Sequence, residues 1–340
     1  MGGGFSERIF HTICSSENLF AAWNEFRKGK NKKPDVLVFA LRVENNIFEL
    51  QRELRESRWK GDGYTSFSIR DPKPRSIHEA SVRDRVLHQA VYRVLYLLFD
   101  QSFIHDSYSS RMGKGTHIAI RRLENILRKE SKNYRKPIYV LKCDIRKFFD
   151  SIDRIILMRL IEKKIDCPET LNLIRKILDT FHKTPGRGLP LGNVTSQLFA
   201  NVYMNEFDQC MKRELGITYY LRYCDDFVIV SDSRTELAAL ISVLNNRLKS
   251  TLKLEMHPNK VCIRSLKQGV DFLGAVILPY RVITRTKTKH RICKKLRKID
   301  ADPEKARQIV ASYLGHISHH KASFLRRNLY NVLSKQKPKR

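Results

Sequence analysis

The stretch YYLRYCDDFVIV, residues 219–230, places two adjacent aspartates among residues that favour β-strands. Tyr, Leu, Val, Ile and Phe suit a pleated, half-buried surface, whereas Asp does not. Two neighbouring carboxylates also repel each other, and they lose hydration when they are buried. Asp225 and Asp226 therefore either form the solvated tip of a hairpin or face a metal ion that compensates their charge.

A large surplus of positive charge runs through the 340-residue chain. Lys and Arg number 65 against 35 Asp and Glu, which gives a formal net charge of +30. Such a surplus predicts a polyanionic partner, with nucleic acid as the first candidate and an anionic membrane surface as the second. The basic residues are densest after Arg281. The length suffices for two or three subdomains.

The sequence has no segment typical of membrane insertion or secretion. No apolar run approaches the ~20 residues that a membrane-spanning helix needs. The N-terminal residues lack the basic and apolar regions of a secretory signal. MGGGFS, residues 1–6, fits a myristoylation pattern, but we interpret it as a glycine-rich leader or a remnant of cloning. We therefore expect no membrane partner.

Cysteine and histidine spacing does not predict a zinc site. None of the seven cysteines lies within four residues of another, so zinc-type pairs are missing. The odd number and wide scatter indicate reduced thiols in a cytoplasmic protein. His316 and His320 are one helical turn apart, but no carboxylate or cysteine accompanies them. We interpret this segment as a helix face that meets phosphate or solvent.

Hydrophobic periodicity and turn residues predict alternating helices and strands. Up to about residue 70 we expect helices joined by basic loops, followed by a proline-broken loop or edge strand. Asp144 closes a strand, and Asp153 is a plausible N-cap. The last 60 residues are expected to be helical and very basic. Further elements are expected as helices over 47–59, 80–99, 153–164 and 235–248 and as short strands near 253–256 and 270–278.

The strand ends bring carboxylates into one sheet. Asp144 ends one strand, and Asp225 and Asp226 lie between two others. In a protein of net charge +30 this acidic group needs a compensating cation. Mg²⁺ accepts a few carboxylates and completes its shell with phosphate oxygens. Two such ions, ~3.5–4 Å apart, activate a hydroxyl and stabilise a leaving oxygen. The pattern indicates phosphoryl transfer on nucleic acid.

Seven motifs, in order over about residues 66–278, resemble those of reverse transcriptases. The doublet in YCDD matches their Tyr-x-Asp-Asp box, and LKCDIRKFFDSID (141–153) matches their first aspartate motif. The other five are KPRSIHEASVRDRV (73–86), SYSSRMGKGTHIAI (107–120), LPLGNVTSQLFANVYMN (189–205), HPNKVCI (257–263) and VDFLGAVI (270–277).

The resemblance implies an α+β, right-hand polymerase fold. Its palm would be an antiparallel sheet with helices, and its thumb would be short and helical. We expect the N-terminal region and fingers over 1–135 and the palm over 136–278. A fingers segment would lie near 165–190, and the basic thumb would span 279–340.

The resemblance also assigns the metal site. Asp144 and Asp225 would be the main ligands of two Mg²⁺ ions, and Asp226 a weaker or indirect one. The carbonyl of Ile145 would bind one ion. Lys260 matches the lysine proposed to protonate departing pyrophosphate, although a solvated or RNA-contacting lysine is an equal alternative. Asp150 and Asp153 are interpreted as helix-start and surface acids instead.

Other residues match the family's nucleotide and primer contacts. Phe149 corresponds to the aromatic gate that excludes a 2′-hydroxyl, whereas the alternative is a core ring beside Phe148. Arg75 and Lys73 would hold the triphosphate, and Lys73 could equally be a solvated loop charge. The remaining assignments are the backbone amides of Lys147 and Phe148 for the triphosphate, and Phe272, Leu273 and Gly274 for the primer grip.

One departure from the common pattern points to a subgroup. Most family members have Gln before Gly192 and Pro at position 197, where this chain has Leu191 and Gln197. This form resembles reverse transcriptases of diversity-generating retroelements, which copy a template-repeat RNA and misincorporate opposite adenine. An aliphatic Leu191 makes contact without a directional hydrogen bond, so discrimination should weaken. Alternatively, Leu191 is a packing variant.

The subgroup implies further partners and a setting. They are deoxynucleotides, the RNA/cDNA duplex and a small, basic, helical accessory protein, in a prokaryotic cell or encoded by a phage. Retron, group II intron and defence-associated enzymes of ordinary fidelity remain alternatives. The non-enzyme alternative is an RNA-binding scaffold derived from a polymerase. A scaffold would have no need of three clustered carboxylates that repel RNA.

Overall fold

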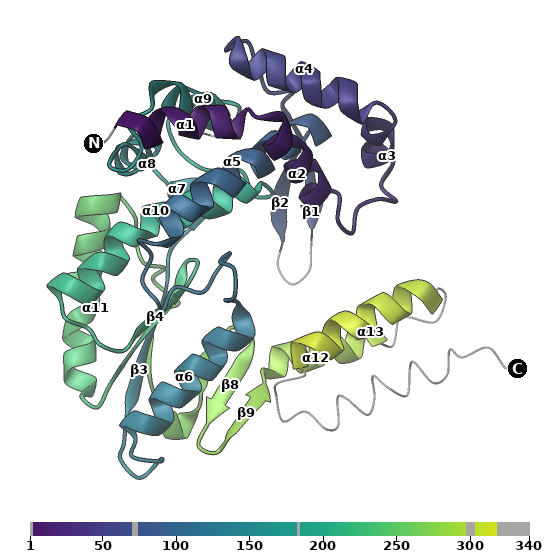
Figure 1. Cartoon of the computed structure of the whole chain (residues 1–340). Helices are drawn as coiled ribbons and strands as arrows, with labels where there is room; N and C mark the ends of the chain where they lie inside the picture. Colours follow the sequence, from purple (N-terminus) through teal and green to yellow (C-terminus); the bar gives the residue numbers. More distant parts are fainter. Residues whose placement is uncertain (1–2, 70–73, 182–183, 297–302, 318–340) are drawn as a thin grey trace, which may run out of the picture. The chain divides into compact units, whose positions relative to one another are not determined.

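The computed structural model describes residues 3–69, 74–181, 184–296 and 303–317. The chain folds into two compact units, each assembled from separate segments. Unit 1 comprises Met1–Arg111, Ile145–Ile217 and Val243–Pro258, and unit 2 comprises Met112–Asp144, Thr218–Ser242 and Asn259–Arg340. Helices and strands occur in both units (Figure 1), so the predicted α+β class is confirmed.

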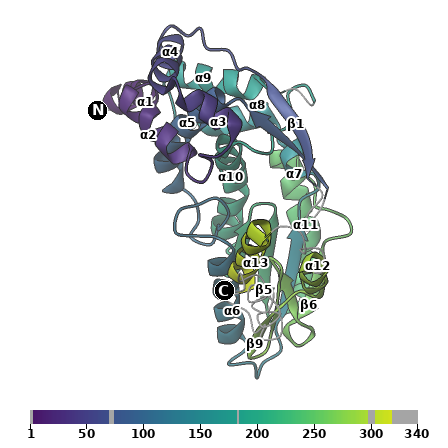
Figure 2. The ribbon, with the colours of Figure 1, turned by 90° about the vertical axis from the view of Figure 1, so that its right-hand side faces the viewer.

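Unit 1 is mainly helical. Its central helix α5 packs against α2 and α10, because its buried residues recur at helical spacing, as in Val86, Leu87, Val91 and Leu95. Strands β1 and β2 form an antiparallel ribbon, which Figure 2 shows from the side. The helices are α1 (Gly3–Ile13), α2 (Ser16–Phe26), α3 (Pro34–Ala40), α4 (Val43–Arg55), α5 (Val82–Asp100), α7 (Phe148–Ser151), α8 (Arg154–Glu162), α9 (Pro168–Asp179), α10 (Val194–Gln209) and the π-helix η1 (Cys210–Glu214), and the strands are β1 (Tyr64–Ile69) and β2 (Arg75–Ala80).

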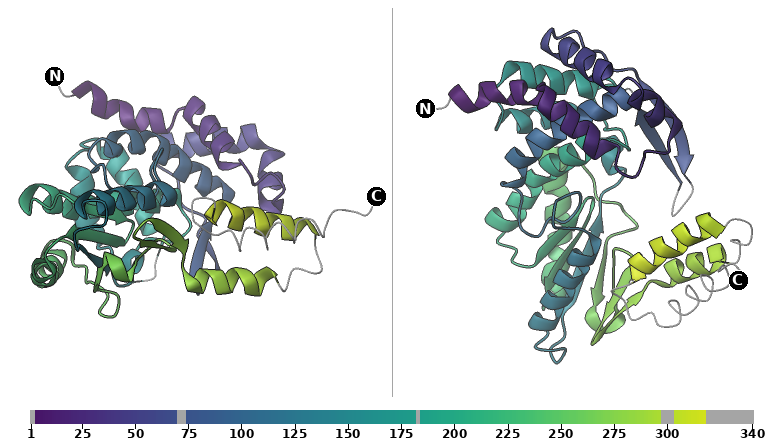
Figure 3. Two further views of the ribbon diagram at one scale, coloured as in Figure 1. Left: turned by 90° about the horizontal axis from the view of Figure 1, so that it is seen from below. Right: turned by 45° about the vertical axis from the view of Figure 1, so that its right-hand side comes forward.

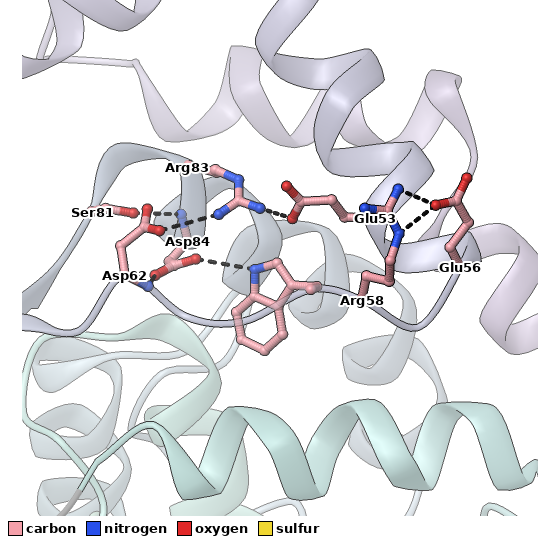
Figure 4. A network of polar contacts seen from close by, with 8 residues as sticks. Glu53, Glu56, Arg58, Asp62, Ser81, Arg83 and Asp84 are labelled. Carbon is pink, nitrogen blue, oxygen red and sulfur yellow. Dashed lines mark hydrogen bonds and ion pairs between the residues drawn. The ribbon is translucent and has the colours of Figure 1, made fainter.

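A network of carboxylates around one arginine fixes the start of α5 in unit 1 (Figure 4). Buried Asp84 accepts hydrogen bonds from Trp59 Nε1, at 3.2 Å, and from the backbone N–H of Asp62, at 2.8 Å. Arg83 forms ion pairs with Glu53 and Asp62. We call Glu53, Asp62 and Asp84 the arginine-bridged cluster. Each of its carboxylates meets a donor of the same unit.

Unit 2 is built on an antiparallel sheet in the order β4-β5-β3-β6, with α6 packed against β4 and β5. A second sheet has the order β7-β8-β9. Two basic helices, α12 and α13, lie side by side (Figure 3), and Lys295 of α12 lies over the Tyr313 ring of α13. The elements are α6 (Thr116–Glu130), β3 (Tyr139–Asp144), β4 (Tyr220–Tyr223), β5 (Asp226–Ser231), β6 (Cys262–Ser265), the 3₁₀ helix η2 (Leu266–Gln268), β7 (Val270–Phe272), β8 (Ala275–Leu278), β9 (Arg281–Thr284), α12 (Thr286–Leu296) and α13 (Pro303–Ile317).

Two local expectations are wrong. Residues before 70 are not only helices and loops, because Tyr64–Ile69 forms β1, paired along its whole length with β2. The strand expected near 253–256 is also missing. Helix α11 (Arg234–Leu252) ends there, and Lys253 has a left-handed φ of 49°. The Leu254 N–H then donates to the Leu248 carbonyl, a helix-capping bond.

The expected helix cap and the later of the two expected strand segments are confirmed. Asp153 caps α8 by accepting hydrogen bonds from the N–H groups of Ile155 and Ile156. The segment 270–278 forms the hairpin β7–β8. All seven cysteines are free. The described ranges contain no helix with both the length and the apolar character needed to cross a bilayer. The expected fingers, palm and thumb boundaries stay a prediction.

Candidate active site

The three candidate aspartates meet on unit 2's main sheet. Asp144, the last residue of β3, lies directly opposite Asp226, the first residue of β5. Directly opposed residues of antiparallel strands project from the same face, so these two carboxylates share a face. Asp225 precedes Asp226 in the turn between β4 and β5. We call Asp144, Asp225 and Asp226 the carboxylate cluster.

The turn that carries Asp225 has an unusual backbone. Tyr223 pairs with Asp226 and leaves only Cys224 and Asp225 as the loop. Cys224 has a φ of 57°, a left-handed conformation that glycine adopts far more readily in such turns. Fully buried Arg222 donates a hydrogen bond of 3.1 Å to the Cys224 carbonyl. The aspartate doublet is therefore the end of a hairpin, held from beneath by a buried guanidinium.

The electrostatics of the carboxylate cluster favour binding of a cation. Asp144 is buried, and Lys260 Nζ lies 2.7 Å from its Oδ1. The pKa of half-buried Asp226 is raised to about 6, mainly by burial and also by the negative charges of Asp225 and Asp144. Lys142 and Lys260 act in the opposite direction. Because Asp225 and Asp144 both contribute to the raised pKa of Asp226, a bound cation would relieve repulsion among the three carboxylates.

The donor set fits a hard divalent ion that shares its shell with a substrate. Within the described residues, no three His, Cys, Asp or Glu side chains are gathered closely enough to enclose a metal by themselves. Carboxylate oxygens on one sheet face are nevertheless the donors that Mg²⁺ uses, and phosphate oxygens complete its coordination. Ile145, whose carbonyl was the expected main-chain ligand, is buried and forms an isolated bridge with Met256.

Lys142 is a candidate that the sequence analysis missed. It lies two residues before Asp144 on β3 and opposite Val228 of β5. Because side chains alternate along a strand, Lys142 projects from the same face as Asp144. The signal was present in VLKCD, where Lys interrupts an otherwise apolar strand.

Unit 1 brings three of the other motifs together through backbone hydrogen bonds. The His78 N–H of β2 donates to the Leu191 carbonyl at 2.9 Å, and the Leu189 N–H donates to the Phe149 carbonyl at 2.9 Å. Phe148 is buried, whereas Phe149 is half-buried, and their ring centroids are 5.4 Å apart. Phe148 is thus the core ring, and Phe149 remains partly exposed.

The remaining nucleotide candidates of unit 1 are largely exposed. Arg75, at the start of β2, Lys147 and Gln197 all reach solvent. Lys147 has a left-handed φ of 45° before α7. Gly192 has a φ of 134°, and a Cβ there would lie 2.8 Å from the His78 carbonyl oxygen, so a larger residue is excluded. Lys73 lies outside the described residues.

A buried neutral network lies behind the glycine loop of unit 1. His88 is fully enclosed, and its Nδ1 lies 2.8 Å from Thr195 Oγ1. Asn193 donates from Nδ2 to His88 Nε2, at 3.1 Å, and to the Tyr64 hydroxyl, at 2.9 Å. Burial lowers the pKa of His88 to about 4. This network positions the loop through neutral groups.

Two further candidates have clear structural positions. The primer-grip residues Leu273 and Gly274 form the two-residue turn of β7–β8, with φ values of 49° and 88°; Phe272 before them is buried.

Asp153 is not the expected surface acid. It is buried, and Lys253 Nζ lies 2.7 Å from its Oδ2, so it stabilises the start of α8.

Comparison with known proteins identifies a matching family and several relatives. The family described as "Reverse transcriptase (RNA-dependent DNA polymerase)" matches residues 69–277. Protein YkfC of Escherichia coli (strain K12) is 25% identical over 279 residues, which are 71% of this chain and 70% of that protein. The group II intron-encoded protein LtrA of Lactococcus lactis is 22% identical over 271 residues. The Retron Ec83 reverse transcriptase of Escherichia coli is 24% identical over 200 residues.

The coverage of these relatives differs. The matches cover 59% of this chain and 44% of LtrA, and 54% of this chain and 59% of the retron enzyme. A solved structure, the telomerase from Candida albicans with the TWJ fragment of telomeric RNA, has a TM-score of 0.51 at 11% identity. That likeness covers 83% of this chain and 61% of the telomerase chain, and it concerns the fold alone.

The fold is that of a right-hand polymerase. The chain belongs to the reverse transcriptase family, whose model covers more than half of it, and its enzyme class is RNA-directed DNA polymerase. Domains of this family generally use divalent metal ions.

Proposed function

We propose that this protein copies an RNA template into DNA by nucleotidyl transfer supported by two Mg²⁺ ions. The observation that carries the proposal is the opposition of Asp144 and Asp226 on one sheet face, with Asp225 in the adjoining turn. Asp144 and Asp225 would hold the ions, with the Ile145 carbonyl as a main-chain ligand and Asp226 as a weaker one. Bound Mg²⁺ would polarise the reacting phosphate and the attacking hydroxyl.

The chain's own residues would bind and orient the deoxynucleotide. Arg75 would grip the triphosphate by paired hydrogen bonds, and Lys260 would deliver a proton to departing pyrophosphate. Half-buried Phe149 would exclude a 2′-hydroxyl, in keeping with the inward position of Phe148. Phe149→Ala should then admit ribonucleotides, which competition between dCTP and CTP measures; an unchanged preference would remove Phe149 from this role.

The catalytic proposal is tested by primer extension on RNA. Asp225→Asn keeps the side-chain size but removes the charge, so we expect incorporation with Mg²⁺ to fall at least about a thousandfold. Asp232→Asn is the matched control, because Asp232 is an exposed acid of the same unit, paired with Lys136. Equal activity of parent and Asp225→Asn would refute the site. An inactive parent that still binds RNA would favour the scaffold alternative.

We further propose that the enzyme belongs to the diversity-generating class and copies a template-repeat RNA with errors opposite adenine. Support comes from Leu191 and Gln197 in the glycine-loop motif. The backbone of Leu191 is fixed by His78, so its aliphatic side chain would contact the nucleotide without a hydrogen bond. A small basic accessory protein and a cytoplasmic setting in a prokaryote or phage belong to the same proposal. Retron and group II intron relatives support an enzyme of ordinary fidelity as the second candidate.

Fidelity separates the two candidates. Restoring an amide with Leu191→Gln adds a constraint of order 1 kcal/mol, so errors opposite template adenine should fall roughly five- to tenfold. Leu215→Gln, at an exposed leucine of unit 1, is the control for the chemical change alone. Sequencing cDNA from one RNA template gives the error spectra. Identical adenine error rates would make Leu191 a packing variant and favour the ordinary-fidelity candidate.

A further inference from the structure

Lys142 occupies an unusual position for a lysine in the interior of a sheet. It lies on the central strand β3, between Val228 of β5 and Cys262 of β6. Its side chain is half-buried, and it projects from the face that carries Asp144 and Asp226. Two residues of strand separate it from Asp144, a rise of about 7 Å.

The Lys142 ammonium has no partner of its own in the parts of the chain that the structure describes. It forms neither a hydrogen bond nor an ion pair there, whereas Lys260 binds Asp144 Oδ1 at 2.7 Å. It nevertheless acts electrostatically on Asp226. The Lys142 ammonium is thus a half-buried cation that no carboxylate contacts. Its N–H donors remain available to a ligand beside the carboxylate cluster.

We propose that Lys142 binds a phosphate group of the substrates beside the carboxylate cluster. The inference rests on the proposed polymerase function and adds a contact to it. An ammonium makes up to three charge-assisted hydrogen bonds, and phosphate offers matching acceptors. The phosphate belongs either to the backbone of the primer strand or to the incoming nucleotide.

The alternative role is that of an internal counter-ion. Lys142 would then only offset repulsion among the aspartates, a task for which direct contact is best. Lys260 already makes that contact with Asp144, and Lys142 does not. The exposed Cys262 beside Lys142 also shows that this part of the face reaches solvent. The geometry therefore favours a ligand from outside the chain.

Equilibrium binding provides the first test, with no nucleotide present. The full chain is titrated with an RNA template annealed to a DNA primer at several salt concentrations. Lys142→Gln should weaken binding about five- to tenfold at ~0.15 M salt, and the slope of log K against log salt should fall by about 1. Lys142→Arg should retain most of the affinity. Lys267→Gln is the matched control, an exposed lysine of the same unit.

A chemically altered primer distinguishes the two sources of phosphate. Methylphosphonate linkages near the primer 3′ end remove single charges. If the primer supplies the phosphate, one such linkage should weaken binding by the parent and have little further effect on Lys142→Gln. If the nucleotide supplies it, primer binding should be unchanged and the KM for deoxynucleotide should rise about five- to tenfold.

Two outcomes would overturn the inference while leaving the polymerase proposal intact. One is a Lys142→Gln enzyme with the affinity, salt slope and nucleotide KM of the parent. The other is a variant that melts at a lower temperature in chelator but binds both substrates normally, which would establish the counter-ion role. Failure of the polymerase proposal can be told apart from failure of this inference. Even if the parent enzyme proved inactive, the salt dependence of its duplex binding could still be compared with that of Lys142→Gln.

Discussion

The arginine-bridged cluster and the carboxylate cluster each gather three acidic side chains, but they treat the charge in opposite ways. In unit 1, Arg83 pairs with two of the carboxylates, and buried Asp84 accepts two N–H donors. In unit 2, Asp144 faces Asp226 across the strands, and one lysine contacts Asp144. Carboxylates that are paired with donors of the same chain stabilise the fold. Carboxylates that face one another instead require a bound cation to offset their repulsion.

The sharpest test of this contrast is removal of the buried acid from the arginine-bridged cluster. Asp84→Ala should lower the free energy of unfolding by about 3 kcal/mol, because the buried Trp59 indole N–H and the partly buried Asp62 N–H lose their acceptor. Urea denaturation in the presence of chelator measures it. Asp232→Ala removes an exposed acid and should leave the free energy of unfolding almost unchanged. A loss below about 1 kcal/mol for Asp84→Ala would contradict the structural role of this cluster.

The neutral network around His88 should make the stability of the protein depend on pH. The folded-state pKa of His88, about 4, lies below the ordinary histidine value of 6.5, so the unfolded chain binds the proton more readily. Stability is therefore full above about pH 6.5 and falls as the pH decreases towards 4. Between pH 7 and 5 the loss should be about 2 kcal/mol.

Comparison of the parent with one variant isolates the His88 contribution. His88→Gln should flatten the dependence of the unfolding free energy on pH over this range. An identical pH slope in the parent and in His88→Gln would show that His88 is not held neutral by its surroundings.

In the carboxylate cluster, removal of a charge should stabilise the metal-free protein. The raised pKa of Asp226, about 6, means that ionisation in the folded state is unfavourable, and stability is lost as the pH rises through that value. At pH 7.5 in chelator, Asp226→Asn should gain about 1 kcal/mol, after allowance for partial exposure. Melting curves with chelator and with Mg²⁺ test this, and the Mg²⁺-induced increase should be smaller in the variant. Destabilisation in chelator would place Asp226 with the structural acids.

The smallest expected effect is at Lys260. Its side chain is 40% exposed, so its ion pair with Asp144 is worth only about 0.5 kcal/mol. Lys260→Gln should destabilise the protein by this amount in chelator, because the repulsion among the aspartates is then less compensated. Mg²⁺ should remove the difference, since the ion replaces the lost charge. A larger deficit with Mg²⁺ than without it would contradict this account.

The sequence predicted those features that depend on interactions between residues close together in the chain. The residues around Asp225 indicated strand, turn and strand, and the cap at Asp153 followed from its position before an apolar helix. The β1 strand was missed because its pairing with β2 depends on the fold of unit 1. The strand expected near 253–256 failed because capping of α11 takes these residues.

The site shows the same division. The motifs predicted a site at Asp144, Asp225 and Asp226, but only burial in the structure showed that Phe148, and not Phe149, is the inward ring. Alternation along VLKCD already places Lys142 on the face of Asp144, but its position relative to Asp226 depends on the register between β3 and β5. The buried state of Arg222, beneath the turn, likewise depends on packing between elements and cannot be derived from periodicity.

The central position of β3 has a consequence for biosynthesis. Both of its partners, β5 and β6, come later in the chain, and Asp226 follows Asp144 by 226 − 144 = 82 residues. At roughly 5–20 residues per second, a ribosome needs about 4–16 s to make that interval. Throughout this time both edges of the largely apolar strand β3 are unpaired, a condition that promotes aggregation. We therefore expect the yield of folded protein to depend on growth temperature and on chaperones that cover nascent strands, more than on the thermodynamic stability of the finished molecule.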